Sequence, residues 1–277
     1  MKRIFIAGNA DKKGCAKAVD KLKVILTDKA VIVGVDLSRG IQLPDEPIDL
    51  IISLGGDGSM LNMVDTVIKK DIPIMGINFG RLGFLTAAIY SELEPIMKAY
   101  LSGHTSEFHR SILELNFTSD NGSVSKYALN DVVIASPDLS RVTSLYVLIS
   151  DEPFFKLRGD GLIISTPTGS TAHSLSAGGS LVDPKLEALL LTPLSPQSLS
   201  SRPIIIRPNA KIEVGLQVGD MNPDILCDGQ HVGFLKKETK LNITTSKKHL
   251  KIVQPKDFRF FKRLSNKLGW AKSFEIN

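Results

Sequence analysis

A carboxylate lies among three glycines in the run Gly55-Gly56-Asp57-Gly58, directly after the apolar segment 50–54. Because glycine has no Cβ, such a loop can turn several main-chain N–H groups toward one anion, and a helix beginning at Ser59 would add its N-terminal dipole. A carboxylate inside a phosphate cradle is unfavourable for binding alone. It is useful if Asp57 accepts the proton of a hydroxyl group that attacks phosphorus. A tight turn containing Asp is the alternative explanation of these four residues.

A second loop that contains glycines, residues 76–85, follows another apolar segment. In a parallel sheet, ligands bind at the carboxyl ends of the strands, so we expect this loop and the Gly55 loop to line one crevice. Arg81 could meet a phosphate there and Phe84 could pack against a purine ring. Packing of Phe84 in the core explains the same residue equally well.

Two further polar segments interrupt apolar ones. Asn130 and Asp131 lie inside a run that is otherwise apolar, where polar groups need partners such as the hydroxyls or amide of a ligand. A β-bulge or an edge position is the alternative. Residues 165–179 are rich in hydroxyls and small side chains, which lets a ligand lie close to the backbone, although a plain loop has a similar composition. Residues 227–230 read as an ordinary Asp-Gly hairpin turn.

Several common site motifs are absent from the sequence. The five histidines are scattered, with no HExxH motif and no paired cysteines, so no protein metal site is expected. There is no GxxxxGK[ST] segment and no GxGxxG segment after a strand, which argues against the usual ATPase and Rossmann sites. No serine lies in a GxSxG elbow, so a hydrolase triad is unsupported.

The first 105 residues alternate between apolar strands and amphipathic helices, which predicts an α/β domain with a parallel sheet. The predicted strands are 4–7, 31–33, 50–54 and 73–77, all apolar as if covered on both faces. The predicted helical stripes are Cys15, Ala18, Val19, Leu22, Ile25 and Leu26, then Leu61, Val64, Val67 and Ile68, then Leu93, Ile96, Met97, Tyr100 and Leu101.

Residues 106–254 carry short alternating segments, which predict a mostly β domain with two stacked sheets. The predicted strands are 113–117, 127–134, 144–149, 161–165, 203–207, 211–214, 224–227, 232–235, 240–244 and 250–253, and 192–203 is predicted to be a connector. The basic tail 255–277 contains Phe258, Phe260 and Phe261, so an amphipathic terminal helix is favoured over a nucleic-acid-binding segment.

The composition is that of an ordinary soluble protein. The chain has 277 residues, 43% hydrophobic and 23% charged residues, and a net charge of +5, which suits polyanionic nucleotide substrates. With only Cys15 and Cys227, disulfides are not expected, and no segment has the pattern of a transmembrane helix or a signal peptide. We therefore expect a cytoplasmic protein with neither a nucleic acid nor a membrane as partner.

Taken together, these segments resemble the NAD kinase family, and the resemblance covers nearly the whole chain. The matching segments, in the family's order and spacing, are 55–58, 76–85, 130–131, 160–179, 191–193 with 199–203, 228–230 and 267–270. The Gly-Gly-Asp-Gly loop alone is shared with lipid kinases and, more distantly, phosphofructokinases. Its combination with segment 160–179 is much more specific.

The resemblance implies that the chain phosphorylates the 2′-hydroxyl of the adenosine ribose of NAD, using ATP with a divalent cation such as Mg²⁺, and so forms NADP and ADP. Asp57 would accept the proton, and Gly55, Gly56 and Gly58 would hold phosphates. The implied NAD-binding residues are Asp57, Gly58, Arg81, Phe84, Asn130, Asp131, Arg158, Asp160, Thr171, Ala172, His173, Ser174, Leu175, Ser176 and Gln230.

The resemblance also implies how the chain is organised. An α/β domain, 1–105, would carry the phosphate loop, and a sandwich-like β domain, 106–254, would bind NAD and form the oligomer. The tail 255–277 would return to the N-terminal domain. In this family Asp160 and its neighbours reach the site of an adjoining subunit, which implies a homodimer or homotetramer.

Two residues depart from the family pattern. His173 replaces the usual Tyr, and we expect a modest change in NAD affinity rather than loss of activity; Ser59 replaces a common Thr with little expected effect. A lipid or sugar kinase is the nearest alternative enzyme, although the polar segments do not suit an acyl chain. A dinucleotide sensor without catalysis is the alternative from another class, and it would tolerate loss of Asp57.

Overall fold

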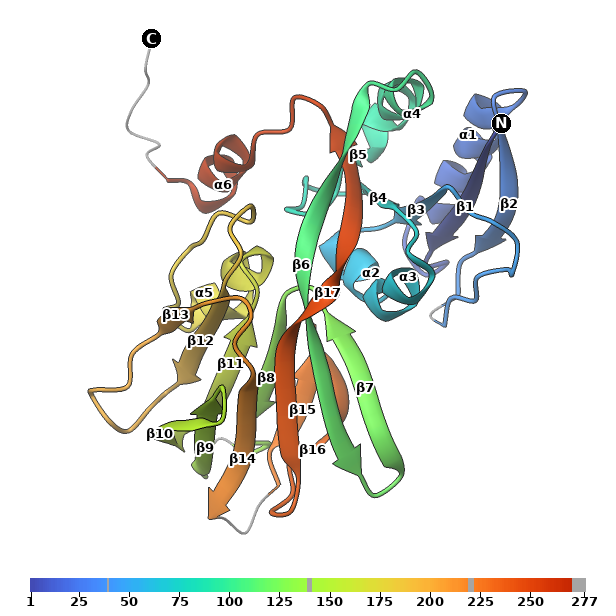
Figure 1. The fold of residues 1–277 in the computed structure, drawn as a ribbon. Helices are drawn as coiled ribbons and strands as arrows, with labels where there is room; N and C mark the ends of the chain where they lie inside the picture. The colour runs from blue at the N-terminus through green and yellow to red at the C-terminus, as the bar shows by residue number, and fades with distance from the viewer. Residues whose placement is uncertain (39, 139–140, 219–221, 271–277) are drawn as a thin grey trace. The chain divides into compact units, whose positions relative to one another are not determined.

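The computed structural model describes residues 1–38, 40–138, 141–218 and 222–270 (Figure 1). The chain divides into two compact units. The first comprises 1–63, 69–109 and the tail from 251 onward, and the second comprises 64–68 and 110–250. The predicted combination of an α/β part and a mostly β part is confirmed. The last residues of the predicted tail, 271–277, lie outside the described part of the chain.

The first unit is built on parallel strands in the order β2-β1-β3-β4-β17. The strands are β1 (Lys2–Gly8), β2 (Ala30–Asp36), β3 (Leu50–Leu54), β4 (Ile74–Asn78), the short β5 (Ala88–Ile89) and the end of β17 (Lys240–Pro255). The helices are α1 (Cys15–Leu26), α2 (Asp57–Leu61), α4 (Leu93–Leu101) after a 3-10 turn at Tyr90–Glu92, and α6 (Phe260–Leu268); α3 (Val64–Lys70) spans the boundary between the units.

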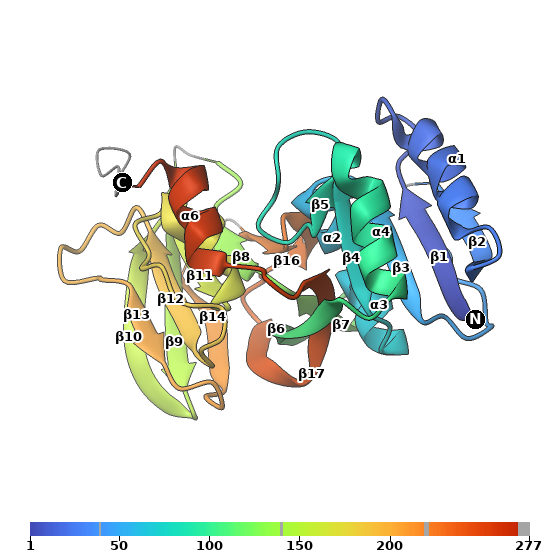
Figure 2. The same ribbon diagram turned by 90° about the horizontal axis from the view of Figure 1, so that it is seen from above.

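Helices cover the sheet of the first unit because its strands are apolar on both faces. Ile4, Ile6 and Ile52 share one core cluster with the predicted buried face of α1 and with α4, which packs beside α1 (Figure 2). The prediction that every strand is covered on both faces was wrong for β2. This strand lies at the edge of the sheet and is only partly buried, with Val31 and Val35 both 41% exposed.

The helix predicted to run on from Ser59 is interrupted. α2 ends at Leu61 after five residues, and α3 begins at Val64. Glycine and asparagine are weak helix formers, and the segment contains Gly58 and Asn62, which accounts for the break. Because α2 is so short, the dipole expected at its N-terminus contributes little to phosphate binding, and the loop must provide the contacts.

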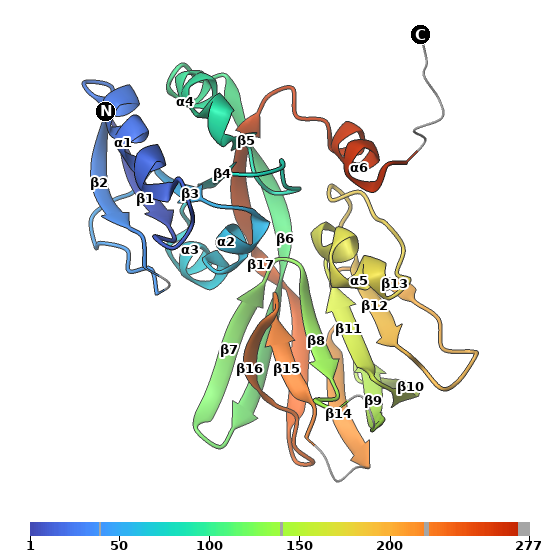
Figure 3. The same ribbon diagram turned by 180° about the vertical axis from the view of Figure 1, so that it is seen from behind.

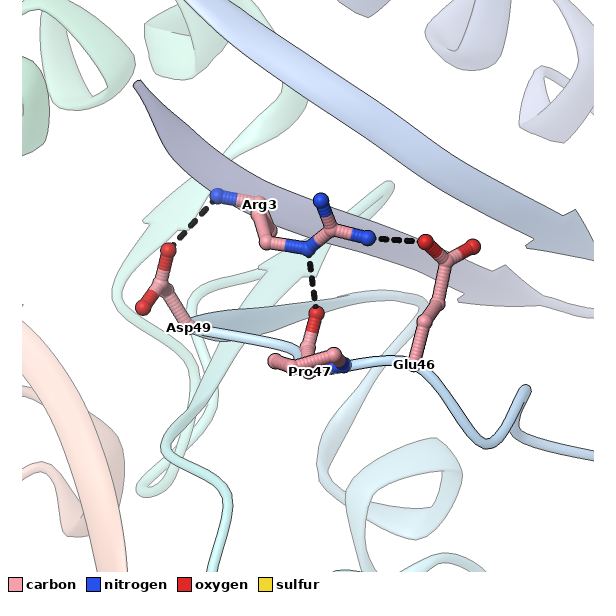
Figure 4. Close-up of polar contacts among 4 residues, drawn as sticks. All are labelled: Arg3, Glu46, Pro47 and Asp49. Atoms are coloured by element: carbon pink, nitrogen blue, oxygen red, sulfur yellow. Dashed lines mark hydrogen bonds and ion pairs between the residues drawn. The ribbon is translucent and has the colours of Figure 1, made fainter.

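Arg3 fixes the segment that leads into β3 (Figure 4). Its main-chain N–H donates to the carboxylate of Asp49 at 2.7 Å, and its Nε donates to the carbonyl of Pro47 at 2.8 Å. Its guanidinium also pairs with Glu46. These contacts hold the entry to β3 beside β1, so that both strands end at the same edge of the sheet, where the glycine loop begins.

The second unit contains antiparallel strands in two sheets, as predicted, with a core to which both sheets contribute (Figure 3). One sheet contains β6 (Thr105–Ser119), β7 (Gly122–Ala128), β9 (Thr143–Ile149), β10 (Glu152–Gly159), β14 (Ile212–Val218) and the first part of β17. The other contains β8 (Asp131–Ala135), β11 (Gly161–Ser165), β12 (Leu189–Leu194), β13 (Ile204–Ile206), β15 (Asp224–Cys227) and β16 (Gln230–Phe234).

Some strand predictions in this unit were wrong. The strand predicted at 127–134 is two strands, which separate at Leu129 and Asn130, and those predicted at 240–244 and 250–253 are one long strand, β17. The predicted connector 192–203 begins inside β12. The strand β10 was not predicted; its residues are mostly exposed and include a proline.

The tail contains the predicted amphipathic helix. Leu264 is buried, the ring of Phe258 packs edge-on against Phe108 at 5.5 Å, and Gly269 ends α6 with a left-handed φ of 64°. The prediction that the tail packs on the N-terminal part of the chain is confirmed, since α6 belongs to the first unit. Among the described helices, none is long and apolar enough to cross a membrane.

Candidate active site

Asp57 is the first residue of α2, at the carboxyl edge of the parallel sheet. Its Oδ2 accepts the main-chain N–H of Phe84 at 2.7 Å, and its Oδ1 accepts that of Leu85 at 3.0 Å. The Gly55 loop and the loop 76–85 therefore meet, as predicted. A carboxylate has about four acceptor positions, and these two hydrogen bonds use two of them. Asp57 therefore keeps lone pairs that can accept a proton from a substrate hydroxyl.

Two glycines allow this close approach. A Cβ on Gly83 would lie 1.9 Å from Asp57 Oδ1, which no side chain could tolerate. Gly55 has a φ of 153°, and a Cβ there would lie 2.1 Å from Ser59 Oγ and 2.9 Å from Lys12 Nζ. The predicted phosphate loop is thus tightly closed around its polar groups, and Gly83 was not singled out by the sequence.

Lys12 brings a positive charge to the glycine loop, where its Nζ donates to Ser59 Oγ at 2.8 Å. Lys12, Ser53 and Ser59 line a cavity of about 250 Å³ at the carboxyl ends of β1, β2 and β3. The hydroxyl of Ser53 is buried and has no hydrogen-bond partner among the described residues. A buried hydroxyl without a partner is costly, so the cavity is prepared for a polar ligand.

The aromatic ring of Phe84 is held by the C-terminal helix. It lies 6.4 Å from the ring of Phe260, with Lys267 Nζ 4.8 Å above its centroid. Phe84 and Lys267, with Arg81 and Arg263, line a cavity of about 1120 Å³. Burial lowers the pKa of Arg263, while the charges of Asp57 and Glu92 act in the opposite direction. The fold therefore places several cations beside the loop that holds Asp57.

In the second unit, two side chains hold the segment 129–131. The carboxylate of Asp228 accepts the main-chain N–H groups of Leu129, Asn130 and Asp131, at 2.7, 2.7 and 3.1 Å. Thr166 Oγ1 donates to the carbonyl of Leu129 at 2.6 Å. The polar pair predicted at 130–131 therefore does not interrupt a strand: Asn130 precedes β8, and Asp131 is its first residue.

The carboxyl groups of Asp131, which is buried, and Asp228, which is half-buried, are neighbours. Burial raises the pKa of Asp131 to about 7, and the charge of Asp228 adds to this, while the main-chain N–H of His173 favours the charged form. Burial raises the pKa of Asp228 to about 6, against three opposing main-chain donors. Two carboxyls so placed resist full ionisation unless a ligand supplies donors.

The segment 168–176 folds into a 3-10 turn (Thr168–Thr171) and α5 (His173–Ser176) beside Asp131. A Cβ on Gly169 would lie 2.0 Å from the carbonyl of Asn130, so the two segments pack main chain to main chain. Ser174 is buried and shares a 2.9 Å hydrogen bond with Thr192. Of the predicted NAD-binding residues here, His173 and Ser176 are exposed, while Thr171, Ala172 and Leu175 are half-buried.

The structure does not bring Arg158 and Asp160 to this group. Both precede β11, whereas Asp131 pairs with Ser165 at the other end of that strand. The rise of a strand separates its two ends by about 13 Å. Gln230 is exposed and follows the Asp228 turn. Through Cys227 it lies at the end of the sheet where β8 begins with Asp131.

No group of three or more His, Cys, Asp or Glu side chains in the described ranges could hold a metal ion. The site residues that sequence reasoning missed are Lys12, Ser53, Gly83, Thr166, Asp228 and Arg263. For Asp228 and Lys12 a sequence signal existed, namely a carboxylate in a tight turn and a lysine after the first strand. Gly83 and Thr166 lie inside segments that the sequence did single out, 76–85 and 165–179, whereas Ser53 and Arg263 carry no local signal.

Comparison with known proteins agrees with this geometry. Residues 4–105 match the family model of the ATP-NAD kinase N-terminal domain, and 129–255 that of its C-terminal domain. An NAD kinase of Teredinibacter turnerae is 38% identical over 97% of this chain and 96% of its own, and one of Pectobacterium atrosepticum is 36% identical over 89% of each.

Solved structures agree as well. An NAD kinase from Archaeoglobus fulgidus in complex with ATP superposes with a TM-score of 0.73 at 25% identity, covering 97% of this chain and 99% of that one. Yeast NADH kinase complexed with NADH shares the fold, with a TM-score of 0.86 at 22% identity over 100% of this chain and 90% of that one. The resemblance drawn from the motifs is confirmed, and the chain belongs to the ATP-NAD kinase family.

Proposed function

We propose that this chain transfers the γ-phosphate of ATP to the 2′-hydroxyl of the adenosine ribose of NAD, with Asp57 as the proton acceptor. The 2′-oxygen forms a bond to the γ-phosphorus, the bond from that phosphorus to the β–γ bridging oxygen breaks, and ADP leaves with that oxygen. The hydroxyl proton passes to a carboxylate oxygen of Asp57. The observation that carries this proposal is the orientation of that carboxylate by the N–H groups of Phe84 and Leu85.

The donor enters as its complex with a divalent cation, which spreads the charge of the phosphates. Gly55, Gly56 and Gly58 hold phosphates through their main chain, and Lys12 adds an ammonium group beside them. The cavity lined by Lys12 and Ser53 supports this role, since a phosphate oxygen would provide the missing partner of the Ser53 hydroxyl. Charge-assisted hydrogen bonds of this kind are the strong ones.

NAD is held by Asn130 and Asp131 at its ribose hydroxyls, and by the segment 171–176 and Gln230 at its other groups. Arg81 and Phe84 are further NAD contacts in this proposal. The enclosed pair Asp131 and Asp228 supports it, because ribose hydroxyls are donors that favour the charged form of Asp131.

Arg158 and Asp160 act on NAD from a neighbouring subunit of a homodimer or homotetramer. Their place at the far end of β11 from Asp131 supports this, since within one chain they are remote from that proposed ribose contact. Asp160→Asn and Asp57→Asn chains should each be inactive alone. A mixed oligomer of the two should recover part of the activity, because one of its sites combines an intact Asp57 from one chain with an intact Asp160 from the other. If mixed oligomers form but no activity is recovered, a shared site is contradicted.

A cytoplasmic location stays a prediction.

The direct test is to incubate the purified protein with NAD and MgATP and to quantify NADP. General-base catalysis typically contributes about 10²–10⁴-fold, so Asp57→Asn should lose kcat by at least that range. Calorimetric titration with NAD and a circular dichroism spectrum control for binding and folding. An Asp57→Asn variant with nearly normal kcat would assign Asp57 to ordering the phosphates. If the wild type binds NAD but forms no NADP, the result would favour a dinucleotide sensor or a different phosphate donor. Polyphosphate would then be tested as the donor.

A further inference from the structure

A single arginine of the C-terminal helix reaches the loop that holds Asp57. Arg263 Nη1 lies 2.7 Å from the carbonyl oxygen of Thr86, 3.2 Å from that of Gly83 and 3.4 Å from that of Phe84. The guanidinium is half-buried and lies over the ring of Phe258, 4.5 Å from its centroid. It is therefore confined between an aromatic face and a row of carbonyls.

The same peptide groups bind both Arg263 and Asp57. The peptide that joins Gly83 to Phe84 accepts from Arg263 through its C=O and donates to Asp57 through its N–H. The peptide that joins Phe84 to Leu85 does the same. In a trans peptide the C=O and N–H point in opposite directions, so both dipoles run from the guanidinium to the carboxylate.

We propose that Arg263 is a positioning residue for Asp57, acting through these two peptide groups; this rests on the proposed function of Asp57 as proton acceptor. Hydrogen bonds in such a chain polarise and orient one another. A catalytic group must be held within about 0.5 Å of its productive position, and a misplacement of about 1 Å can cost about 100-fold in rate. The C-terminal helix thereby becomes part of the catalytic apparatus without touching the reacting atoms.

Direct binding of a substrate phosphate by Arg263 is the competing explanation, because Arg263 also lines the cavity beside α6. The two roles separate kinetically. A positioning residue affects kcat with little effect on KM, whereas a substrate-binding residue raises KM. The positioning role also requires arginine, since a lysine keeps the charge but lacks the planar group that spans several carbonyls.

The experiment compares Arg263→Met with Lys262→Met, which removes the same charge from an exposed neighbouring position of α6. We expect Arg263→Met to lower kcat by about 10–100-fold, with KM for NAD and for ATP within about threefold. The kcat of Arg263→Lys should lie between those of the wild type and Arg263→Met. If Arg263→Met does not fold, Arg263→Lys takes its place in the comparison. An unchanged kcat, or a rise confined to KM, would overturn the proposal.

Hydrogen exchange provides a readout that does not depend on turnover. Exchange of the Phe84 and Leu85 amides, followed by NMR or in peptides covering 83–87, should be faster in Arg263→Met than in Lys262→Met. Equal exchange rates in the two variants would refute the positioning of Asp57 through these peptide groups, even if kcat fell. If wild-type protein formed no NADP, the proposed function would fail, while the exchange comparison would still decide whether Arg263 orders the amides that bind Asp57.

Discussion

The carboxylate of Asp228 accepts the main-chain N–H of Asn130 at 2.7 Å, although the two residues lie 98 positions apart in the chain. Through this bond and those to Leu129 and Asp131, a turn between β15 and β16 builds the start of β8. The Asp-Gly turn is thus more than a chain reversal. It forms the main-chain frame that holds the proposed ribose-binding pair.

Asp228→Asn should weaken NAD binding. An amide has one acceptor oxygen, so its NH₂ would face either the N–H of Leu129 or those of Asn130 and Asp131, leaving a buried donor without a partner at a cost of about 1–3 kcal/mol. We expect KM for NAD to rise by about 5- to 150-fold, the factors that correspond to that cost. The matched control is Asp224→Asn in the same hairpin, which removes a partly exposed contact to His231 worth at most about 1 kcal/mol. Equal effects of the two substitutions on KM would contradict this role.

The raised carboxyl pKa values predict a specific dependence of stability on pH. The pKa of Asp131 in the folded protein is about 7, above an ordinary value of 3.8. A raised folded-state pKa means that this carboxyl's contribution to stability is complete below about pH 4 and is lost as pH rises through 7. Asp131→Asn removes the titration, so the urea midpoint of the variant relative to wild type should rise from pH 5 to pH 8. A difference that is constant over this range would refute the shift.

The sequence predicted those parts of the molecule that local periodicity determines. The buried face of α1 and the strand β3 follow directly from apolar spacing, and the loop 55–58 follows from its glycines. Strand boundaries were harder, because polar residues such as Lys247 and Lys248 interrupt the pattern of β17 without ending the strand.

Several of the missed site residues act through partners that are distant in the chain. Arg263 lies 180 residues from Gly83, whose carbonyl it binds, and a basic tail gives no indication of which arginine turns inward. Asp228 was hidden because its turn is fully explained by local Asp-Gly chemistry. Such contacts depend on tertiary packing, which a single sequence does not reveal.

Gly83→Ala should abolish most activity while keeping the fold. The new methyl group would lie 1.9 Å from Asp57 Oδ1, so either the carboxylate or the loop must move. A displacement of about 1 Å can cost about 100-fold in kcat. Gly80→Ala in the same loop is the control, since no atom lies within 4 Å of a Cβ there. Normal kcat in Gly83→Ala would show that the contact between Asp57 and the loop is dispensable.

Lys12→Met should raise KM for ATP and leave KM for NAD nearly unchanged. The Lys12 ammonium lies beside Ser59 and the cavity of the glycine loop, and a hydrogen bond to a charged group contributes about 1.5–3 kcal/mol, which corresponds to about 10–100-fold. The neighbouring exposed Lys13, replaced by Met, controls for the loss of charge. If both variants raised KM for ATP equally, the effect would be general electrostatic attraction rather than a contact at Lys12.

His173→Tyr should change KM for NAD by less than about tenfold, the effect of about 1.4 kcal/mol. The side chain of His173 is exposed at the start of α5, whereas its contact to Asp131 uses the main-chain N–H, which tyrosine retains. Only the ring presented to the ligand changes, and both rings can stack on it. His173→Ala, which removes the ring, should weaken NAD binding more than His173→Tyr. A wild type that is inactive until Tyr is introduced would show instead that this histidine blocks the site.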